Sequence, residues 1–235
     1  DSHRTSTSCL FIDGNLMRSE ESSEEARLSS GAKRAAGRPR KQDAFLDPGV
    51  IVDAAWALVE RDGVDALTTR TLAASLGVKS PALYWHVPSM TALHSLMVER
   101  MLTESIRNPQ AGEAWDVWLY DVGLAQRRNF LSHRDSGRIL AVAPPTEVTR
   151  NQVMPMLMAP LVKAGFPPKD AVAAAGTFAS FILGWVIYEQ SAETSSYIAS
   201  MVDLATAFEF GLAALIAGLN RQMQGSPPDH MEDCA

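Results

Sequence analysis

Two helix signals flank a single glycine in residues 67–87, LTTRTLAASLGVKSPALYWHV. Thr68 or Thr69 can cap a first helix, because a hydroxyl at that position accepts from a backbone N–H that the helix leaves unpaired. Gly77 stands where a helix ends in the left-handed conformation that glycine adopts at low cost. Pro81 suits the first turn of a second helix, where its missing N–H costs nothing. The segment therefore predicts a helix-turn-helix.

The second of these helices is too polar and aromatic on its outer face to be plain core. Leu83 is its inward anchor, whereas Tyr84, Trp85 and His86 are three large hydrogen-bonding side chains in a row and cannot all face inward. In a helix-turn-helix protein the second helix enters the major groove of DNA. We therefore expect this chain to bind double-stranded DNA.

The charge of the chain is unevenly distributed. The net charge is −6, yet residues 33–90 hold 8 Lys or Arg and 6 Asp or Glu, whereas residues 91–235 hold 10 and 15. A basic front and an acidic rear suit a protein that meets DNA at one end.

A family resemblance lies on the same residues. Residues 48–102 resemble the DNA-binding domain of the TetR family of transcriptional regulators, and the tracts GVDALTTRTLAASLGV and SPALYWHV resemble its tetracycline repressors in particular. The chain from there to about residue 220 fits the family's helical ligand-binding and dimerisation domain more loosely. The resemblance implies that Thr68, Thr69 and Arg70 hold a phosphate at a helix N-terminus. The alternative is a cap followed by a solvated arginine.

The resemblance also implies how the recognition segment meets DNA. Residues 80–82 approach base edges, Tyr84 and His86 contact a phosphate or flank it, and Trp85 either packs or touches the DNA backbone. Ala82 can meet a thymine methyl. Most polar contacts to bases therefore fall to Lys79 and Ser80. The predicted contacts here are Lys79, Ser80, Pro81, Ala82, Tyr84, Trp85 and His86.

One phosphate anchor is missing, because this chain has Met90 where the tetracycline repressors offer a lysine. Arg38, Arg40 and Lys41, in the segment GRPRK, are the predicted replacement. An extended basic segment of this kind resembles arms that lie in an A·T-rich minor groove. The alternative is an unstructured charged tail.

The rest of the chain shows helical periodicity and no convincing alternating strand, so we expect an all-α fold. Asp47 and Pro48 predict the start of the first helix, and Gly63 its end. We expect a disordered arm (1–43), a helix-turn-helix domain with its connecting helix (44–107), a helical ligand-binding and dimerisation domain (108–221) and a disordered tail (222–235). Within the third segment we expect helices over 113–133, 135–142, 146–164 (bent at Pro155 or Pro160), 169–190 and 198–221, with a polar loop over 191–197.

Residues 171–188 carry no charge, which makes them a formal membrane-span candidate. The run is rich in alanine, glycine and serine, and Asp170 and Glu189 close it abruptly. A helix that is apolar on all sides is either buried or membrane-spanning. We expect a buried helix at the seam of a homodimer and no membrane contact. The N-terminal residues show no sustained apolar run, so we expect no secretory signal and a cytoplasmic protein.

The resemblance places a small-molecule effector among the helices of the second domain. Polar and aromatic side chains on those helices are the candidates, although aromatics at helical spacing are more often core than pocket. The candidates are Trp115, Trp118, Asp121, Gln126, Phe130, His133, Arg138, Phe178, Phe181, Trp185 and Tyr188.

The tetracycline repressors bind a magnesium-bound drug with histidines and a glutamate, and this chain departs from that pattern. Ile106 and Leu140 align with the histidines, Val122 and Gln126 stand for other polar and aromatic contacts, and the glutamate aligns with Tyr188 or, after a one-residue slip, with Glu189. We therefore expect no magnesium site of that kind and an effector other than tetracycline.

No other chemistry is indicated. Cys9 and Cys234 lie in the predicted tails, and the five histidines show no metal-ligand spacing. Nucleophile elbows, phosphate loops and dinucleotide fingerprints are lacking too. We expect a homodimeric repressor, without metal or cofactor, that an effector releases from a palindromic operator. The alternatives are an activator or ligand-independent regulator of the same kind and, remotely, a helical-bundle enzyme with an accessory DNA module.

Overall fold

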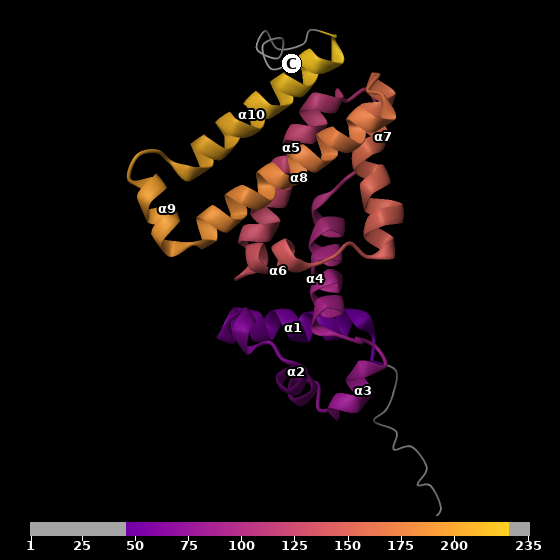
Figure 1. Ribbon diagram of the computed structural model, residues 1–235, viewed down its shortest axis with the longest axis vertical. Helices are drawn as coiled ribbons and strands as arrows, with labels where there is room; N and C mark the ends of the chain where they lie inside the picture. Colours follow the sequence, from indigo (N-terminus) through magenta and orange to yellow (C-terminus); the bar gives the residue numbers. More distant parts are fainter. Residues whose placement is uncertain (1–45, 226–235) are drawn as a thin grey trace, which may run out of the picture. The chain divides into compact units, whose positions relative to one another are not determined.

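The computed structural model describes residues 46–225, and every regular element among them is helical (Figure 1). The predicted all-α fold is therefore confirmed. The first helices are α1 (Pro48–Asp62), the short 3-10 helix η1 (Val64–Ala66), α2 (Thr69–Ser75), α3 (Ser80–Tyr84) and α4 (Met90–Ser105). They are followed by α5 (Trp115–Leu131), α6 (Ser136–Val142), the π-helical stretch η2 (Thr149–Val153), α7 (Met154–Ala164), α8 (Pro168–Gln190), α9 (Ala192–Ala199) and α10 (Leu204–Met223).

The helix-turn-helix forms as predicted from its caps. The Thr68 hydroxyl accepts from the backbone N–H of Thr71 at 3.1 Å, and the Thr71 hydroxyl accepts from the N–H of Thr68 at 2.9 Å. This reciprocal pair satisfies two donors at the start of α2. Gly77 ends the helix region at φ +67, and Pro81 lies in the first turn of α3. Leu83 is 2% exposed and anchors α3 inward.

α1 begins and ends where the sequence predicts. The Asp47 carboxylate accepts from the N–H of Gly49 at 2.7 Å, and Gly63 follows the helix at φ +85. The side chains of Ile51, Ala55 and Val59 are fully buried, because they recur on one helix face.

The later helices pack around α5, which lies against α8 and α10. Gly123 makes this approach close, because a Cβ there would lie 2.7 Å from Leu212 Cδ2 on α10 and 3.3 Å from Phe178 Cε2 on α8. Trp118 on α5 is fully buried in the same core. In Figure 1, α8 and α10 run beside each other, and α9 joins their ends.

Two helix boundaries differ from the prediction. The predicted polar loop over 191–197 is wrong, because residues 192–199 form α9, and the next helix begins at Leu204 rather than at 198. Local hydroxyl contacts allow this polar segment to be helical: Ser191 Oγ donates to Thr194 Oγ1 at 3.0 Å. Asp203 caps the following helix by accepting from the N–H of Thr206 at 2.8 Å.

A π-helical stretch, η2, immediately precedes α7, with Pro155 in the first turn of α7 and Pro160 inside it. The predicted bend at Pro155 or Pro160 stays a prediction. Proline lacks the N–H that would continue the α-helical ladder, and a π-helical stretch is one way to accommodate that loss.

α8 is the one helix among the described residues that is long and apolar enough to cross a membrane on its own. Its most apolar window has a mean hydropathy of 1.7, and 33% of that window is buried. Within one chain this helix is therefore buried on one face only, and its burial at the seam of a homodimer stays a prediction. Val172, Ile187 and Tyr188 lie on the exposed part, where they are 52%, 38% and 52% exposed.

Candidate DNA-binding and effector surfaces

The recognition helix α3 leaves its aromatic end uncovered. Trp85 is 90% exposed and Tyr84 is 52% exposed, whereas the neighbouring Leu83 is buried. The burial of Leu83 fixes the orientation of the helix, so that the residues on either side of it face outward. Packing of Trp85 within the described chain is therefore not observed, and this indole is available to a partner.

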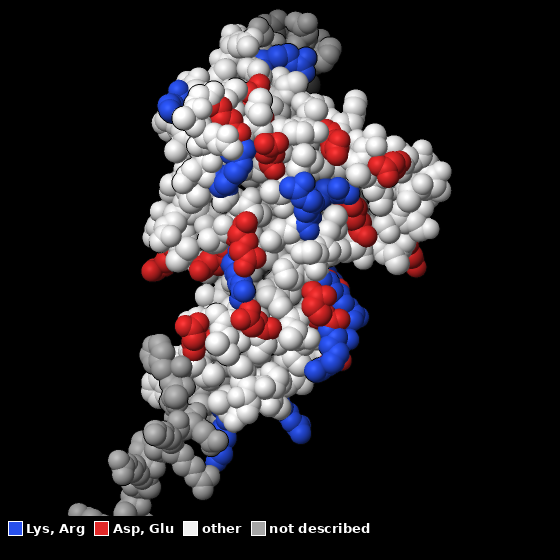
Figure 2. All heavy atoms as spheres, turned by 180° about the vertical axis from the view of Figure 1, so that it is seen from behind, with Lys and Arg blue, Asp and Glu red and all other residues white. Residues whose placement is uncertain are grey.

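The sequence on either side of this helix carries two cations and no carboxylate. Residues 66–98 contain Arg70 and Lys79 as their charged side chains and no Asp or Glu, and both cations are exposed. Figure 2 shows basic and no acidic side chains at the end of the described part where Figure 1 places α2 and α3. Elsewhere on that face acidic and basic side chains are interspersed. This end of the molecule therefore suits a polyanion.

The predicted phosphate contacts at the start of α2 differ in how free they are. The Thr68 hydroxyl is engaged as the helix cap, and the Thr69 hydroxyl donates to Met90 Sδ at 3.8 Å. Arg70 is exposed. Ser80, Ala82 and His86 are partly buried, and Pro81 is exposed. Arg38, Arg40 and Lys41 lie outside the residues that the structure describes.

The predicted effector residues fall into groups in different parts of the structure. One group is core: Trp118, Gln126, Phe130 and Phe178 are at most 3% exposed. The Trp118 Nε1 donates to the carbonyl of Arg107 at 2.8 Å, which ties α5 to the end of α4. These side chains hold the helices together.

A second group is aromatic and lies between α8 and α10. The rings of Phe181 and Trp185 have centroids 5.3 and 6.1 Å from that of Phe208. A further aromatic candidate, Trp115 at the start of α5, packs edge-on against Phe166, with centroids 5.1 Å apart.

The remaining candidates face elsewhere. Asp121 pairs with Arg107 at 3.1 Å, and Tyr188 is half exposed on α8. His133 stacks on Trp56 of α1 and Arg138 pairs with Asp65 of η1, so both contact the helix-turn-helix region.

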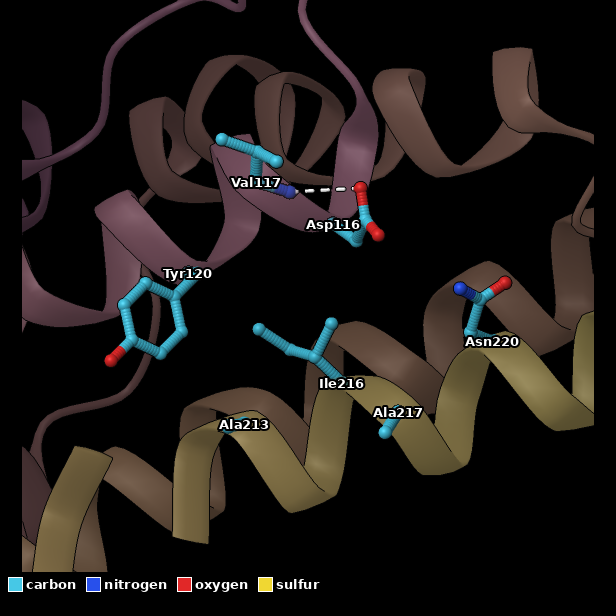
Figure 3. Close-up of a pocket in the computed structure, with 7 residues that line it drawn as sticks. All are labelled: Asp116, Val117, Tyr120, Ala213, Ile216, Ala217 and Asn220. Atoms are coloured by element: carbon cyan, nitrogen blue, oxygen red, sulfur yellow. Dashed lines mark hydrogen bonds between the residues drawn. The ribbon is translucent and has the colours of Figure 1, made fainter. Parts of the chain in front are cut away.

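A groove between α5 and α10 was not predicted (Figure 3). It has a volume of about 370 Å³ and is lined by Asp116, Val117, Tyr120, Ala213, Ile216, Ala217 and Asn220. Desolvation, followed by the nearby charges of Glu209 and Asp121, raises the pKa of Tyr120. The spacing of Asp116 and Tyr120, four residues apart on one helix face, is the sequence signal that could have indicated this groove.

The polar centre of helices α5 to α10 is an ion pair. Arg127 on α5 donates to both carboxylate oxygens of Glu189 on α8, at 2.8 and 2.6 Å. The side chains are 14% and 8% exposed, and the guanidinium lies 5.0 Å from the centroid of the Phe208 ring. A bidentate pair of this kind fixes the relative position of two helices.

This arrangement does not fit magnesium. Ile106 and Leu140, predicted to stand where the tetracycline repressors have their metal-site histidines, are apolar, and Glu189 is held by Arg127. Within residues 46–225, no three His, Cys, Asp or Glu side chains are grouped so that they could hold a metal ion.

The segment between α4 and α5 is held by a second bidentate pair. Arg107 donates to the two Glu113 oxygens at 2.7 and 2.6 Å, and the N–H of Gln110 donates to the same carboxylate at 2.7 Å. The Arg107 hydrogen bonds, followed by the Gln110 N–H, lower the pKa of Glu113 to about 2. The segment between α4 and α5 is thus held by a carboxylate that stays charged at pH values well below the ordinary pKa of a glutamate.

Comparison with known proteins agrees with this architecture. The family model for "Bacterial regulatory proteins, tetR family" matches residues 51–95, and that for "Tetracyclin repressor-like, C-terminal domain" matches residues 108–197. The class G tetracycline repressor protein of Vibrio anguillarum is 33% identical over 199 residues, which cover 75% of this chain and 94% of that protein. The class A protein of Escherichia coli is also 33% identical, with coverages of 75% and 92%.

Solved structures show the same likeness. A TetR variant from Acinetobacter baumannii AYE, in complex with minocycline, has 36% identity and a TM-score of 0.68, and covers 76% of this chain and 99% of that one. Streptomyces coelicolor ActR in complex with actinorhodin has 24% identity and a TM-score of 0.68, with coverages of 76% and 97%, and supports the fold alone.

Proposed function

Because this chain belongs to the TetR family of transcriptional regulators, with a DNA-binding and a ligand-binding domain, we propose that it is a homodimeric repressor that a small molecule releases from a palindromic operator. The observation that carries this proposal is the recognition helix, whose Trp85 is 90% exposed, in a stretch of sequence whose two cations, Arg70 and Lys79, are exposed as well. The exposed aromatic end of α3 and the lack of Asp and Glu in residues 66–98 both favour a polyanionic partner.

The dimer rests on the apolar surface of α8 and α10. Phe210 on α10 is 77% exposed, and two thirds of the apolar window of α8 is not buried within one chain. Pairing these helices with their copies would cover that surface and place two recognition helices in successive major grooves. The operator is then palindromic, because it mirrors the two-fold axis. A cytoplasmic location follows from this function.

The effector, in this proposal, binds among α5, α8 and α10 and favours the conformation that does not bind DNA. Its largest effect equals the difference between its affinities for the two conformations. A magnesium-bound tetracycline is not the proposed ligand, because Glu189 is paired with Arg127 and the aligned histidines are absent. An aromatic ligand suits the Phe181, Trp185 and Phe208 surroundings.

Two alternatives to a ligand-released repressor are considered next. An activator or a ligand-independent regulator would bind DNA equally well, and a promoter-reporter assay with and without the gene separates these from a repressor. An enzyme with an accessory DNA module is disfavoured, because the matching family models and relatives are regulatory proteins and repressors.

Selection of DNA from a random pool by the full chain, at about 0.15 M salt, tests the proposal. We expect enrichment of a palindrome, and Trp85→Ala should reduce the enrichment. Enrichment of A·T-rich sequence alone would overturn the specific operator and assign the main contact to the GRPRK arm. In a second assay, tetracycline with magnesium should leave the operator complex intact, and its release would show that the pocket assignment is wrong.

A further inference from the structure

The corner between α5 and α6, residues 132–138, contacts the helix-turn-helix region through several hydrogen bonds. The Asp135 carboxylate accepts from the N–H of Val64 at 2.9 Å, at the start of η1. The N–H of Arg134 donates to the Glu60 carboxylate at 2.9 Å. Arg138 donates to both oxygens of Asp65 at 2.9 and 2.7 Å. The corner therefore holds the end of α1 and the whole of η1.

Packing adds to these bonds. The His133 ring stacks on Trp56 of α1, with centroids 4.3 Å apart and planes inclined by 29°. Asp135 has φ +56, and no other non-glycine residue among those described has a positive φ. A strained conformation of this kind persists when its surroundings over-determine it. The corner thus has a defined shape and acts on α1 as one unit.

The other side of the corner is held by one side chain at the end of α8. The Gln190 Oε1 accepts from the N–H of Gly137 at 2.9 Å, and its Nε2 donates to the His133 carbonyl at 2.7 Å and to Ser136 Oγ at 3.0 Å. Gly137 packs so closely that a Cβ there would lie 3.1 Å from Ile187 Cγ1. Both ends of the Gln190 amide are therefore used to bind the corner.

We propose that Gln190 is a positioning residue, through which the end of α8 sets the position of the helix-turn-helix. The preceding residue, Glu189, is bound to Arg127 of α5. A displacement of this end of α8, by an effector or at the dimer seam, therefore reaches α1 through the corner. The inference rests on the proposed function, because the displacement it describes is the one by which an effector would release the operator.

The partly buried amide contacts contribute more to this connection than the ion pairs. Arg138 and Asp65 have side chains that are 57% and 82% exposed, and exposed pairs of this kind contribute little. The bonds of Gln190 and the Asp135–Val64 bond are shielded on one side by packing.

The test compares the full chain with Gln190→Met, which keeps the length of the side chain and removes its hydrogen bonds. Hydrogen exchange of the Val64 amide, in the protein without DNA, should become about 10-fold faster in the variant, because its acceptor Asp135 is no longer held in place. The dissociation constant for the selected operator should rise about 5- to 10-fold. The dependence of that constant on salt should not change, since no phosphate contact is lost.

Glu193→Gln, on exposed α9 three residues further on, is the matched control and should change neither quantity. A Gln190→Met protein in which Gly137 exchanges faster but Val64 does not would overturn the inference, because Gln190 would then support only its own corner. Faster Val64 exchange with unchanged operator affinity would overturn it too.

Two further arms keep the outcomes distinct. If Gln190→Met does not fold, Gln190→Glu keeps the acceptor for Gly137 but cannot donate to the His133 carbonyl, so Val64 exchange should still become faster, and no change would be decisive against the inference. The exchange measurement uses neither DNA nor effector. It therefore tests whether Gln190 positions the corner against Val64 even if the random pool yields no operator, a result that would count against the proposed function alone.

Discussion

Replacement of Gly123 by alanine tests how closely α5 approaches its neighbours. The new Cβ would lie 2.7 Å from Leu212 Cδ2, 3.1 Å from Leu212 Cδ1 and 3.3 Å from Phe178 Cε2. Carbon atoms in contact are normally about 3.5–4.0 Å apart. Leu212 and Phe178 are both fully buried, so neither side chain can move without displacing others.

The expected loss of stability follows from two opposing effects. Overpacking a core costs about 1–3 kcal/mol, and three short contacts place this site in the upper half of that range. Alanine in a helix is about 1 kcal/mol more favourable than glycine. We therefore expect Gly123→Ala to lower the free energy of unfolding by about 1–2 kcal/mol.

Gly176→Ala on α8 is the control, because a Cβ there meets nothing within 4 Å in the single chain. It has the same helix-propensity gain, so the difference between the two variants isolates overpacking. Denaturant unfolding of both variants, at two protein concentrations, measures that difference and detects any effect of Gly176 on dimerisation. A Gly123→Ala protein as stable as Gly176→Ala would refute the close approach of α5 to α10.

Three further outcomes are expected. Glu113→Gln should destabilise the protein most above pH 5; because the folded pKa of about 2 lies below the ordinary 4.5, the gap to wild type should close as the pH falls from 4.5 toward 2 in acid unfolding curves. Tyr84→Ala combined with His86→Ala should weaken operator binding about 100-fold or more, at about 1.5–3 kcal/mol for each of the two charge-assisted contacts, while sedimentation shows an unchanged oligomer. Unaltered affinity would remove α3 as the recognition helix. Deletion of residues 1–42 should lower the salt slope of operator binding by up to about 3 units, and an identical slope would mean that the arm does not touch phosphate.

The parts of the fold that could be predicted are those that local chemistry decides. The caps at Asp47 and Thr68, the left-handed Gly77 and the inward Leu83 each depend on a few neighbouring residues, and the structure has all four. The helix over 192–199 was missed, because a polar run gives no apolar period and its helix depends on hydroxyl contacts.

The effector residues were harder to predict for a different reason. Periodicity shows that Trp118 or His133 belongs to a helix face, but not which element that face meets. In the structure Trp118 bonds the carbonyl of Arg107, and His133 stacks on Trp56, 77 positions earlier in the chain. The groove beside Tyr120 and the role of Gln190 likewise depend on pairings between distant segments.

The uncovered apolar faces of α8 and α10 have a consequence for gene dosage. If two copies must associate before the operator is bound, operator occupancy at low copy number rises with the square of the protomer concentration. Halving the amount of protein would then reduce occupancy about fourfold in that regime. A cell that makes less of the protein, for example from a weaker promoter, would therefore lose regulation more steeply than it would with a monomeric regulator.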